Sequence, residues 1–169
     1  MHILEFKHCP NCKGELERHE EYLRCLSCGE KIYINPTPGV SVLPVKDGKV
    51  LLSRRAIEPW KGEIDTVGGF MKPNESAEEA GLRETKEETG LIVGDLIYLG
   101  TYPSEYGHPV GEPVINIYYI AEVKSGKEVA DDDVSELLWF PIEKTGKIKS
   151  SFANVLNSLR DLRRWFKNL

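Results

Sequence analysis

The sequence predicts an α/β fold: an α/β/α sandwich with a mixed sheet, preceded by a small cysteine-rich module. Short apolar runs separated by turn residues recur between residues 40 and 140, which is the pattern of sheet strands. Two segments, 77–89 and 152–166, have helical spacing instead. All four cysteines stand among the first 28 of 169 residues. A sheet with one helix on each side buries the apolar faces of these elements.

The composition is that of one domain of ordinary size with a small appendage. Apolar residues make up 40% of the chain and charged residues 29%, with a net charge of −5 and a pI near 5.5. This balance argues against a broad nucleic-acid surface, which is usually basic. No run reaches the roughly 18 apolar residues of a membrane span, and the first residues lack a signal-peptide core. We therefore expect a cytoplasmic protein without a membrane segment.

The cysteines form two CxxC pairs, and twelve residues separate the pairs. Pairs of this kind turn the chain around a tetrahedral Zn²⁺. Disulfides are disfavoured in the cytosol, and a redox CxxC is a single motif near a βαβ pattern, whereas two occur here. We predict a zinc ribbon over residues 1–36 with one structural zinc ion per chain, held by Cys9, Cys12, Cys25 and Cys28.

The ribbon is expected to contain a hairpin within Leu16–Arg24. Gly14 and Gly29 each follow a cysteine pair and suit tight turns. Four cysteines already complete a structural zinc site, so the nearby His2, His8 and His19 are expected at the surface.

The second domain is expected over residues 37–169, after a proline-punctuated connector at 34–39. Asp47-Gly48 between two apolar runs predicts a hairpin. The expected strands are Val40–Val45, Val50–Leu52, Leu91–Leu99, Val114–Val123 and Leu137–Phe140. Loops are expected at Thr101–Pro113 and at Asp131–Asp133. A helix near the C-terminus presents an apolar stripe of Phe152, Val155, Leu156, Leu159, Leu162, Trp165 and Phe166.

A glycine loop and an acidic helix carry the chemical signal of this chain. Gly68 and Gly69 allow close backbone approach, Ala77–Thr89 reads as a helix that follows capping residues at 74–76, and Gly90 ends it. Glu84, Glu87 and Glu88 share one helix face at spacings i, i+3 and i+4. A solvated acidic face is the common reading of such a helix. Mg²⁺ or Mn²⁺ would remove the repulsion between the three carboxylates.

The order of these residues resembles the signature of the Nudix hydrolases. The matching positions are Gly69, Glu75, Arg83, Glu84, Glu87, Glu88, Gly90 and Leu91. Thr85 departs from the pattern, because an aliphatic residue is usual there; we expect its methyl group to pack away from the acidic face. The resemblance covers about residues 37–145 and implies the Nudix fold.

The resemblance also implies roles for individual residues. It makes Glu84, Glu87 and Glu88 ligands of Mg²⁺ or Mn²⁺, with the Gly68 or Gly69 carbonyl as a further ligand, and Glu87 or Glu88 able to activate water. Arg83 and Glu75 would support the carboxylates. Some family members use an acidic loop residue as the base; here the choices Glu105, Glu112, Asp132, Asp133 and Glu136 stay open.

The cysteine module followed by Tyr33-Ile-Asn-Pro36 resembles the zinc ribbon of NADH, ADP-ribose and FAD pyrophosphatases. NADH-specific enzymes carry a Ser-Gln-Pro-Trp-Pro-Phe-Pro array, which Thr101–Pro109 lacks. The implied activity is hydrolysis of a nucleoside diphosphate linked to another moiety, with ADP-ribose or FAD favoured over NADH. A house-cleaning triphosphatase and a nucleotide-sensing regulator without catalysis are the alternatives. A small-molecule nucleotide is the expected partner, and a homodimer is left open.

The sequence offers several candidate residues for nucleotide binding, and each also has a structural interpretation. Arg54 or Arg55 could grip a phosphate, with a surface salt bridge as the alternative. Aromatic side chains could stack a base or simply anchor loops and core; the ones considered are Trp60, Phe70, Tyr106, Tyr102 and Tyr33. His108 lies in the same expected loop and suits a ribose or ring.

Overall fold

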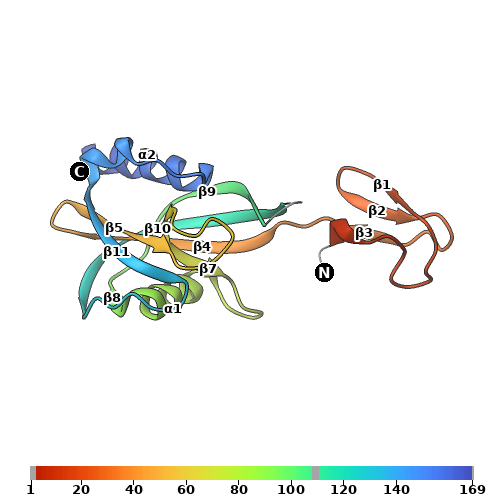
Figure 1. The fold of residues 1–169 in the computed structure, drawn as a ribbon, viewed down its shortest axis with the longest axis horizontal. Coiled ribbons are helices and arrows are strands. Elements are labelled where there is room, and N and C mark those ends of the chain that lie inside the picture. The colour runs from red at the N-terminus through yellow and green to blue at the C-terminus, as the bar shows by residue number, and fades with distance from the viewer. Residues whose placement is uncertain (1–2, 108–110, 169) are drawn as a thin grey trace. The chain divides into compact units, whose positions relative to one another are not determined.

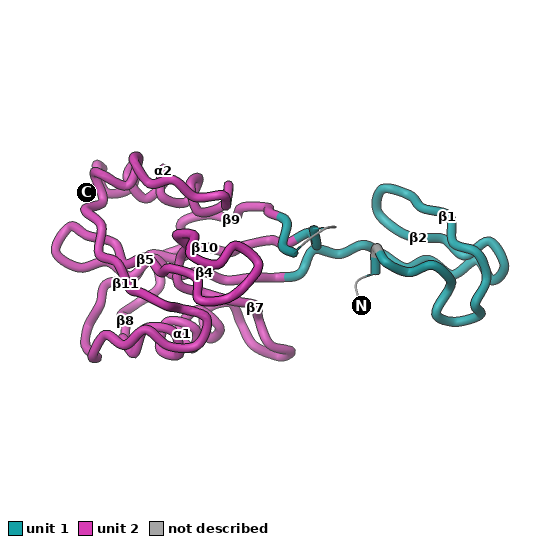
Figure 2. The backbone as a smooth tube through the Cα atoms, viewed as in Figure 1, with its two compact units in different colours: residues 1–37, 105–113 teal, residues 38–104, 114–169 magenta. Residues whose placement is uncertain are grey.

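The computed structural model describes residues 3–107 and 111–168, which fall into two compact units (Figures 1 and 2). One unit comprises residues 1–37 and 105–113, and the other comprises residues 38–104 and 114–169. The expected division into domains at 1–36 and 37–169 stays a prediction. His2 and His108 lie outside the described residues.

The first unit contains a small antiparallel sheet of three strands in the order β1-β2-β3. The expected hairpin is present as its first two strands, and the third strand was not predicted from the sequence. Its elements are the 3-10 helix η1 (Ile3–Glu5), β1 (Leu16–Arg18), β2 (Tyr22–Cys25) and β3 (Lys31–Tyr33).

The second unit is built on an eight-stranded sheet with the path β11-β5-β4-β10-β8, from which β6, β7 and β9 branch. Two helices cover its opposite faces, α1 on one and α2 on the other (Figure 1). The predicted α/β/α sandwich is therefore confirmed. Its elements are β4 (Thr37–Lys46), β5 (Lys49–Arg55), β6 (Ile64–Asp65), β7 (Val67–Phe70), α1 (Ala77–Thr89), β8 (Leu91–Val93), β9 (Ile97–Tyr106), β10 (Glu112–Gly126), β11 (Val134–Pro141), the 3-10 helix η2 (Ile142–Lys147) and α2 (Ala153–Lys167).

The first hairpin of this unit opens away from its turn. β4 and β5 pair beside the turn at Val45 and Val50. Further along, β5 pairs with β6 and β4 pairs with β7. The short β6–β7 segment therefore occupies the fork between the two long strands and sets Gly69 opposite Val40 in β4.

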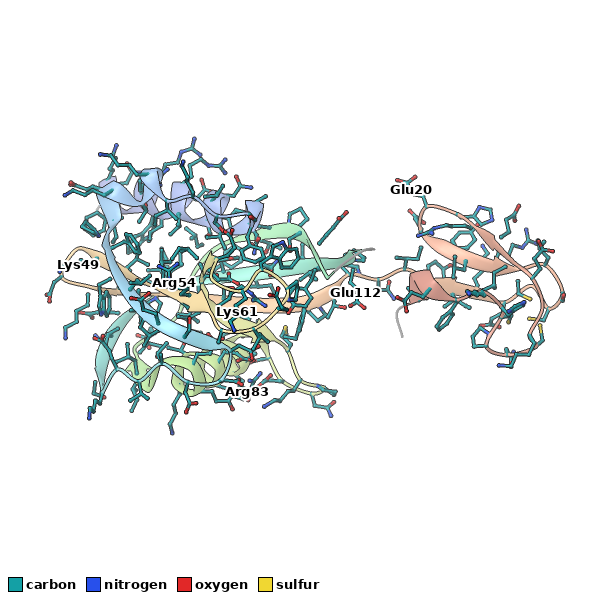
Figure 3. All side chains as sticks on the ribbon, in the orientation of Figure 1. Glu20, Lys49, Arg54, Lys61, Arg83 and Glu112 are labelled. Atoms are coloured by element: carbon teal, nitrogen blue, oxygen red, sulfur yellow. The ribbon has the colours of Figure 1, made fainter. Side chains whose placement is uncertain are left out.

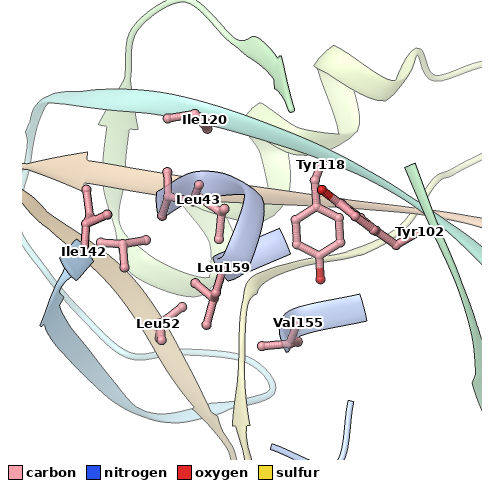
Figure 4. Packing of buried hydrophobic residues seen from close by; sticks show 10 residues of the cluster. Leu43, Leu52, Tyr102, Tyr118, Ile120, Ile142, Val155 and Leu159 are labelled. Atoms are coloured by element: carbon pink, nitrogen blue, oxygen red, sulfur yellow. The ribbon is translucent and has the colours of Figure 1, made fainter. Parts of the chain in front are cut away.

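The central strands separate two apolar layers, because successive side chains of a strand point to opposite faces. Leu43 and Tyr118 pack with Leu159 of α2, as Figure 4 shows. The neighbouring Val40 and Tyr119 pack with Ala80 of α1. Burial on both faces explains why β10 shows only partial alternation in the sequence.

The prediction of a long loop at Thr101–Pro113 is wrong. β9 continues to Tyr106 and β10 begins at Glu112, so most of this segment is paired strand. Its high content of Gly, Pro and Tyr suggested a loop, but Tyr102 is a core residue at 9% exposure. The single strand expected over Leu91–Leu99 is also wrong, since residues 94–96 separate β8 from β9.

The apolar stripe of α2 is confirmed except at Leu156. Val155, Leu159 and Leu162 are at most 1% exposed, whereas Leu156 is 40% exposed. Leu156 follows the helical spacing, yet it lies at the edge of the stripe. Among residues 3–107 and 111–168, no helix is both long and apolar enough to span a lipid bilayer.

Candidate functional site

Helix α1 is defined at both ends by its own sequence. The Ser76 hydroxyl accepts a hydrogen bond from the Glu79 amide at 3.1 Å, and the Glu79 carboxylate accepts one from the Ser76 amide at 2.8 Å. This capping box satisfies two amide groups at the helix start. Gly90 ends the helix with a φ of 69°, where its amide donates to the Lys86 carbonyl. The bounds predicted from the sequence are confirmed.

Arg83 ties the helix to the loop that precedes it. Its guanidinium donates to both carboxylate oxygens of Glu75 at 2.7 and 2.9 Å. One of its terminal nitrogens also contacts Glu84 at 2.6 Å and Glu87 at 2.9 Å. The Arg83 hydrogen bonds lower the pKa of Glu75 to about 2. Arg83 therefore holds three carboxylates in place, and its side chain lies on the α1 side of the unit (Figure 3).

Glu88 is the most buried carboxylate of the acidic face. It is 6% exposed, and one oxygen accepts a hydrogen bond from the Gly68 amide at 2.9 Å. Burial raises the pKa of Glu88 to about 8, and the negative charges of Glu84, Asp65 and Asp132 act in the same direction. Burial also raises the pKa of Glu84. Two desolvated carboxylates beside each other are stabilised by a cation.

The glycines opposite the helix are required by close contacts. A Cβ atom on Gly69 would stand 2.6 Å from Glu84 Oε1, and one on Gly68 would stand 2.1 Å from the Val40 carbonyl oxygen. Only glycine lets this strand approach both the acidic face and β4. The carboxylate oxygens and the nearby backbone form a donor set suited to Mg²⁺ or Mn²⁺.

The four cysteine sulfurs form a second cluster, with every pair within 4.8 Å. Cys9 and Cys28 are 3.8 Å apart, and Cys12 and Cys25 are 3.4 Å apart. A tetrahedral zinc site with Zn–S bonds of about 2.3 Å separates its sulfurs by about 3.8 Å. The spacing therefore fits a zinc ion, whereas a disulfide requires about 2.0 Å.

The thiols in this cluster differ in acidity. The Cys28 amide lowers the pKa of Cys25 to about 6. The Glu30 amide lowers the pKa of Cys28, but the neighbouring cysteine sulfurs and burial together outweigh it and raise that pKa to about 12. A zinc ion bound by four cysteines requires all four thiols to be ionised.

The two cysteine turns repeat one backbone pattern. Cys9 and Cys25 each donate their amide to the carbonyl five residues later, that of Gly14 or Glu30, at 2.9 Å. The left-handed position of each turn is Lys13, with a φ of 63°, and Gly29, with a φ of 76°. The left-handed position of the first turn is thus Lys13 and not Gly14. Gly14 is needed for space instead, because its Cβ would stand 2.4 Å from the Ser27 hydroxyl.

A family model described as NUDIX domain matches residues 35–162 of the chain. The chain belongs to the Nudix family. This confirms the resemblance carried by the glycine loop and the acidic helix.

Several Nudix proteins are similar to this chain. An ADP-ribose pyrophosphatase of Methanocaldococcus jannaschii is 36% identical over 135 residues, which cover 80% of this chain and 78% of that protein. The NAD-capped RNA hydrolase NudC of Pseudomonas aeruginosa is 30% identical over 138 residues, again 80% of this chain but 48% of that protein. The chain thus spans about half the length of NudC.

Solved structures agree on the fold. A Nudix hydrolase from Nitrosomonas europaea has a TM-score of 0.70 at 25% identity and covers 96% of this chain and 92% of that chain. The Nudix domain of Shewanella oneidensis NrtR, solved in complex with ADP ribose, has a TM-score of 0.64 at 21% identity. It covers 78% of this chain and 89% of that chain, and it shows the fold alone.

Both arginines considered for phosphate binding are paired inside the Nudix unit. Arg54 contacts Glu136 at 2.9 Å and the Gly62 carbonyl at 2.8 Å. Arg55 contacts Asp65 at 3.2 Å and the Pro59 carbonyl at 3.0 Å. These partners favour structural ion pairs over phosphate binding, although Arg54 keeps 38% of its side chain exposed.

The aromatic residues considered for base stacking separate into four groups. Trp60 packs edge-on against Phe152 at 5.0 Å between ring centroids, which favours a loop anchor. Phe70 is 41% exposed, and its carbonyl accepts from Arg83 at 3.3 Å. Tyr102 is buried and donates to Asp161 at 3.0 Å, so its stacking role is excluded. Tyr33 and Tyr106 belong to the first unit.

Of the five acidic loop residues, Asp132 stands apart because its charge raises the pKa of Glu88. The Asp131 amide next to it donates to the Glu88 carbonyl at 3.3 Å, which holds this loop beside the end of α1. Glu136 is paired with Arg54, and Glu105 and Glu112 belong to the first unit. The Asp133 carbonyl accepts a hydrogen bond from the Ala56 amide at 2.7 Å.

Asp65 is a half-buried residue near the site that sequence reasoning missed. Burial raises its pKa, which the Thr66 amide and Arg55 oppose. Its charge also acts on Glu88. An acidic residue directly after apolar Ile64, three residues before a glycine pair, was the available signal.

Proposed function

We propose that the chain is a Mg²⁺- or Mn²⁺-dependent pyrophosphohydrolase that cleaves a nucleoside diphosphate linked to another moiety. The nucleoside monophosphate is one product. The single observation that carries the proposal is the acidic face of α1, where the buried carboxylates of Glu84 and Glu88 lie against the Gly68–Gly69 strand. Hydrolysis of a pyrophosphate requires its charge to be masked, and the acidic face can recruit the ions that do this.

Each residue of the acidic face has a defined task in this proposal. Glu84, Glu87 and Glu88 hold the divalent cation, with the Gly69 carbonyl as a further ligand. A bound divalent cation masks phosphate charge and lowers the pKa of a water molecule. Arg83 orients Glu84 and Glu87 through its hydrogen bonds. Asp132 is the acidic loop residue that we assign to assist Glu88.

ADP-ribose is the substrate that we place first, followed by FAD and then NADH. The M. jannaschii relative named ADP-ribose pyrophosphatase supports this order, as does the absence of the NADH array from residues 101–109. The NrtR domain in complex with ADP ribose has the same fold. A house-cleaning triphosphatase is the second candidate. A non-catalytic sensor is disfavoured, because all three glutamates are present.

Glutamine substitutions test this proposal. Glu87→Gln and Glu88→Gln each remove a charge from the acidic face, so each should lower turnover by about two decades or more. Glu79→Gln on the same helix is the matched control, because glutamine also completes a capping box. Near wild-type turnover in either active-site variant would refute the role of that residue. Loss of turnover in the control would instead show a general sensitivity of α1.

We also propose that the cysteine cluster holds one structural zinc ion. The spacing of the four sulfurs supports this. Metal analysis of protein purified without added zinc should give about one zinc per chain. A folded, fully reduced protein without zinc would refute the assignment.

A further inference from the structure

A chain of buried polar side chains crosses the otherwise apolar layer between the sheet and α2. Thr66 and Tyr118 are its centre, at 5% and 0% exposure, and Ser41 and Asn154 are its ends. The Thr66 hydroxyl donates to the Ser41 hydroxyl at 3.2 Å. Because its single proton is used there, it accepts from the Tyr118 hydroxyl at 3.0 Å. Tyr118 in turn accepts from the Asn154 amide at 3.0 Å.

The position of Thr66 in the sheet gives this chain its significance. Asp65 pairs with Ser53 of β5, whereas Val67 pairs with Val42 of β4. Thr66 is therefore the residue at which the backbone leaves one strand and joins the other. The Ser53 hydroxyl also donates to the Thr66 carbonyl at 3.4 Å. Side chains from β4, β5 and β10 thus form hydrogen bonds with this single crossing residue.

The crossing residue determines where the next residues stand. Val67 begins the pairing of β7 with β4, and this register places Gly68 opposite Ser41. The Gly68 amide then donates to Glu88. A strand that slips by one residue turns its side chains to the other face and moves its amides out of register. The polar chain therefore fixes the backbone that meets the acidic face of α1.

Stability alone does not account for these residues. The Asn154 side-chain oxygen has no hydrogen-bond partner among the described residues, and an unsatisfied buried acceptor costs about 1–3 kcal/mol. An apolar core of the same shape avoids that loss. The polar chain is consistent with a requirement for one exact backbone position.

We propose that Tyr118, acting through Thr66, is a positioning residue for the metal-binding face formed by Gly68, Gly69 and the α1 glutamates. The inference rests on the proposed function for its kinetic readout. The binding of Mn²⁺ to the protein without substrate gives a second readout that does not depend on hydrolysis.

Two tyrosine variants form a matched test. Tyr118→Phe removes the hydroxyl that holds Thr66. Tyr102→Phe removes a hydroxyl from the neighbouring ring, whose centroid is 5.3 Å from that of Tyr118, but which bonds to Asp161 instead. Tyr118→Phe should lower kcat for ADP-ribose about 10- to 100-fold with KM within about threefold, and should weaken Mn²⁺ binding. Tyr102→Phe should change neither by more than about twofold.

A double variant separates positioning from stability. Tyr118→Phe with Asn154→Leu replaces both polar partners by apolar groups, so its stability should equal or exceed that of Tyr118→Phe. Its kcat and Mn²⁺ affinity should stay low. If this folded protein has wild-type kcat and Mn²⁺ affinity, the proposal is overturned.

Further outcomes are also decisive. Thr66→Val deletes the central hydroxyl with little change in shape. It serves as the test if the double variant does not fold. Wild-type kcat and Mn²⁺ affinity in Thr66→Val would equally overturn the proposal. If the wild-type chain hydrolyses no nucleotide, the proposed function fails. Mn²⁺ binding that is weakened in Tyr118→Phe but not in Tyr102→Phe would still support the positioning role.

Discussion

The Gly68 amide donates a hydrogen bond to Glu88 Oε2 at 2.9 Å and so joins the glycine strand to the acidic helix. This bond gives a buried carboxylate one fixed donor. A single neutral donor does not offset the desolvation of Glu88, and its pKa stays near 8. Burial therefore favours the protonated form of Glu88, and a neighbouring cation would favour its ionised form.

The first prediction concerns the pH dependence of stability without added Mg²⁺. The pKa of Glu88 in the folded chain is about 8, against an ordinary value of 4.5. Between these values the folded state holds a proton that the unfolded state has lost, so this group destabilises the protein as pH rises from about 4.5 to 8. Glu88→Gln should therefore become more stable relative to wild type over this range. Urea unfolding of both proteins at pH 5 and pH 8 measures the difference; a constant difference would contradict the prediction.

The second prediction concerns Gly69. In Gly69→Ala the new Cβ would meet Glu84 Oε1 at 2.6 Å and push this flexible carboxylate aside. We expect a folded protein whose turnover is lower than that of the wild type by about tenfold or more. Gly146→Ala in η2 is the control, since its Cβ would only touch Arg163 at an ordinary 3.4 Å. Equal turnover in the two variants would contradict the close contact between β7 and α1.

The third prediction compares two leucines of α2. Leu159 is 1% exposed and Leu156 is 40% exposed. Leu159→Ala should lower the free energy of unfolding by about 2–5 kcal/mol, because it opens a cavity in the core. Leu156→Ala should change it by about 0.5 kcal/mol, as a surface substitution does. Helical spacing alone predicts that both leucines are buried and that both variants lose similar stability. Chemical denaturation of the two variants tests this against the burial seen in the structure.

Local signals in the sequence predicted the chemistry-bearing elements well. The bounds of α1 follow from Ser76, Glu79 and Gly90, which act within one turn of the helix. The Glu84, Glu87 and Glu88 face follows from helical geometry alone. The Asp47-Gly48 turn and the pairing of its strands are likewise local.

Features that depend on distant residues could not be predicted in this way. The crossing at Thr66 requires β4 and β5 to separate, and no residue near Thr66 indicates this. Arg54 looked available for phosphate, but its partner Glu136 lies 82 residues away. Tyr102 looked like a loop residue, until its pairing and its contact with Tyr118 placed it in the core.

The fourth prediction tests the repeated turns of the cysteine cluster. Gly29 has a φ of 76° and no atom within 4 Å of a Cβ built on it. Gly29→Ala should therefore lower stability by about 1–2 kcal/mol through backbone strain alone. Lys13→Ala, at the equivalent position with a φ of 63°, exchanges one side chain for another and should have little effect. Thermal unfolding of the zinc-loaded proteins measures both, and equal losses would contradict the equivalence of the two turns.

The most direct test of the proposed activity is kcat/KM for ADP-ribose, FAD, NADH and dGTP, measured with and without Mg²⁺ or Mn²⁺. We expect turnover only with the divalent ion, release of AMP from ADP-ribose, and kcat/KM for ADP-ribose or FAD at least equal to that for NADH. A lead of tenfold or more for NADH or dGTP, about 1.4 kcal/mol in transition-state binding, would contradict the substrate order. Absence of metal-dependent hydrolysis for all four would contradict the central claim that the acidic face of α1 is catalytic.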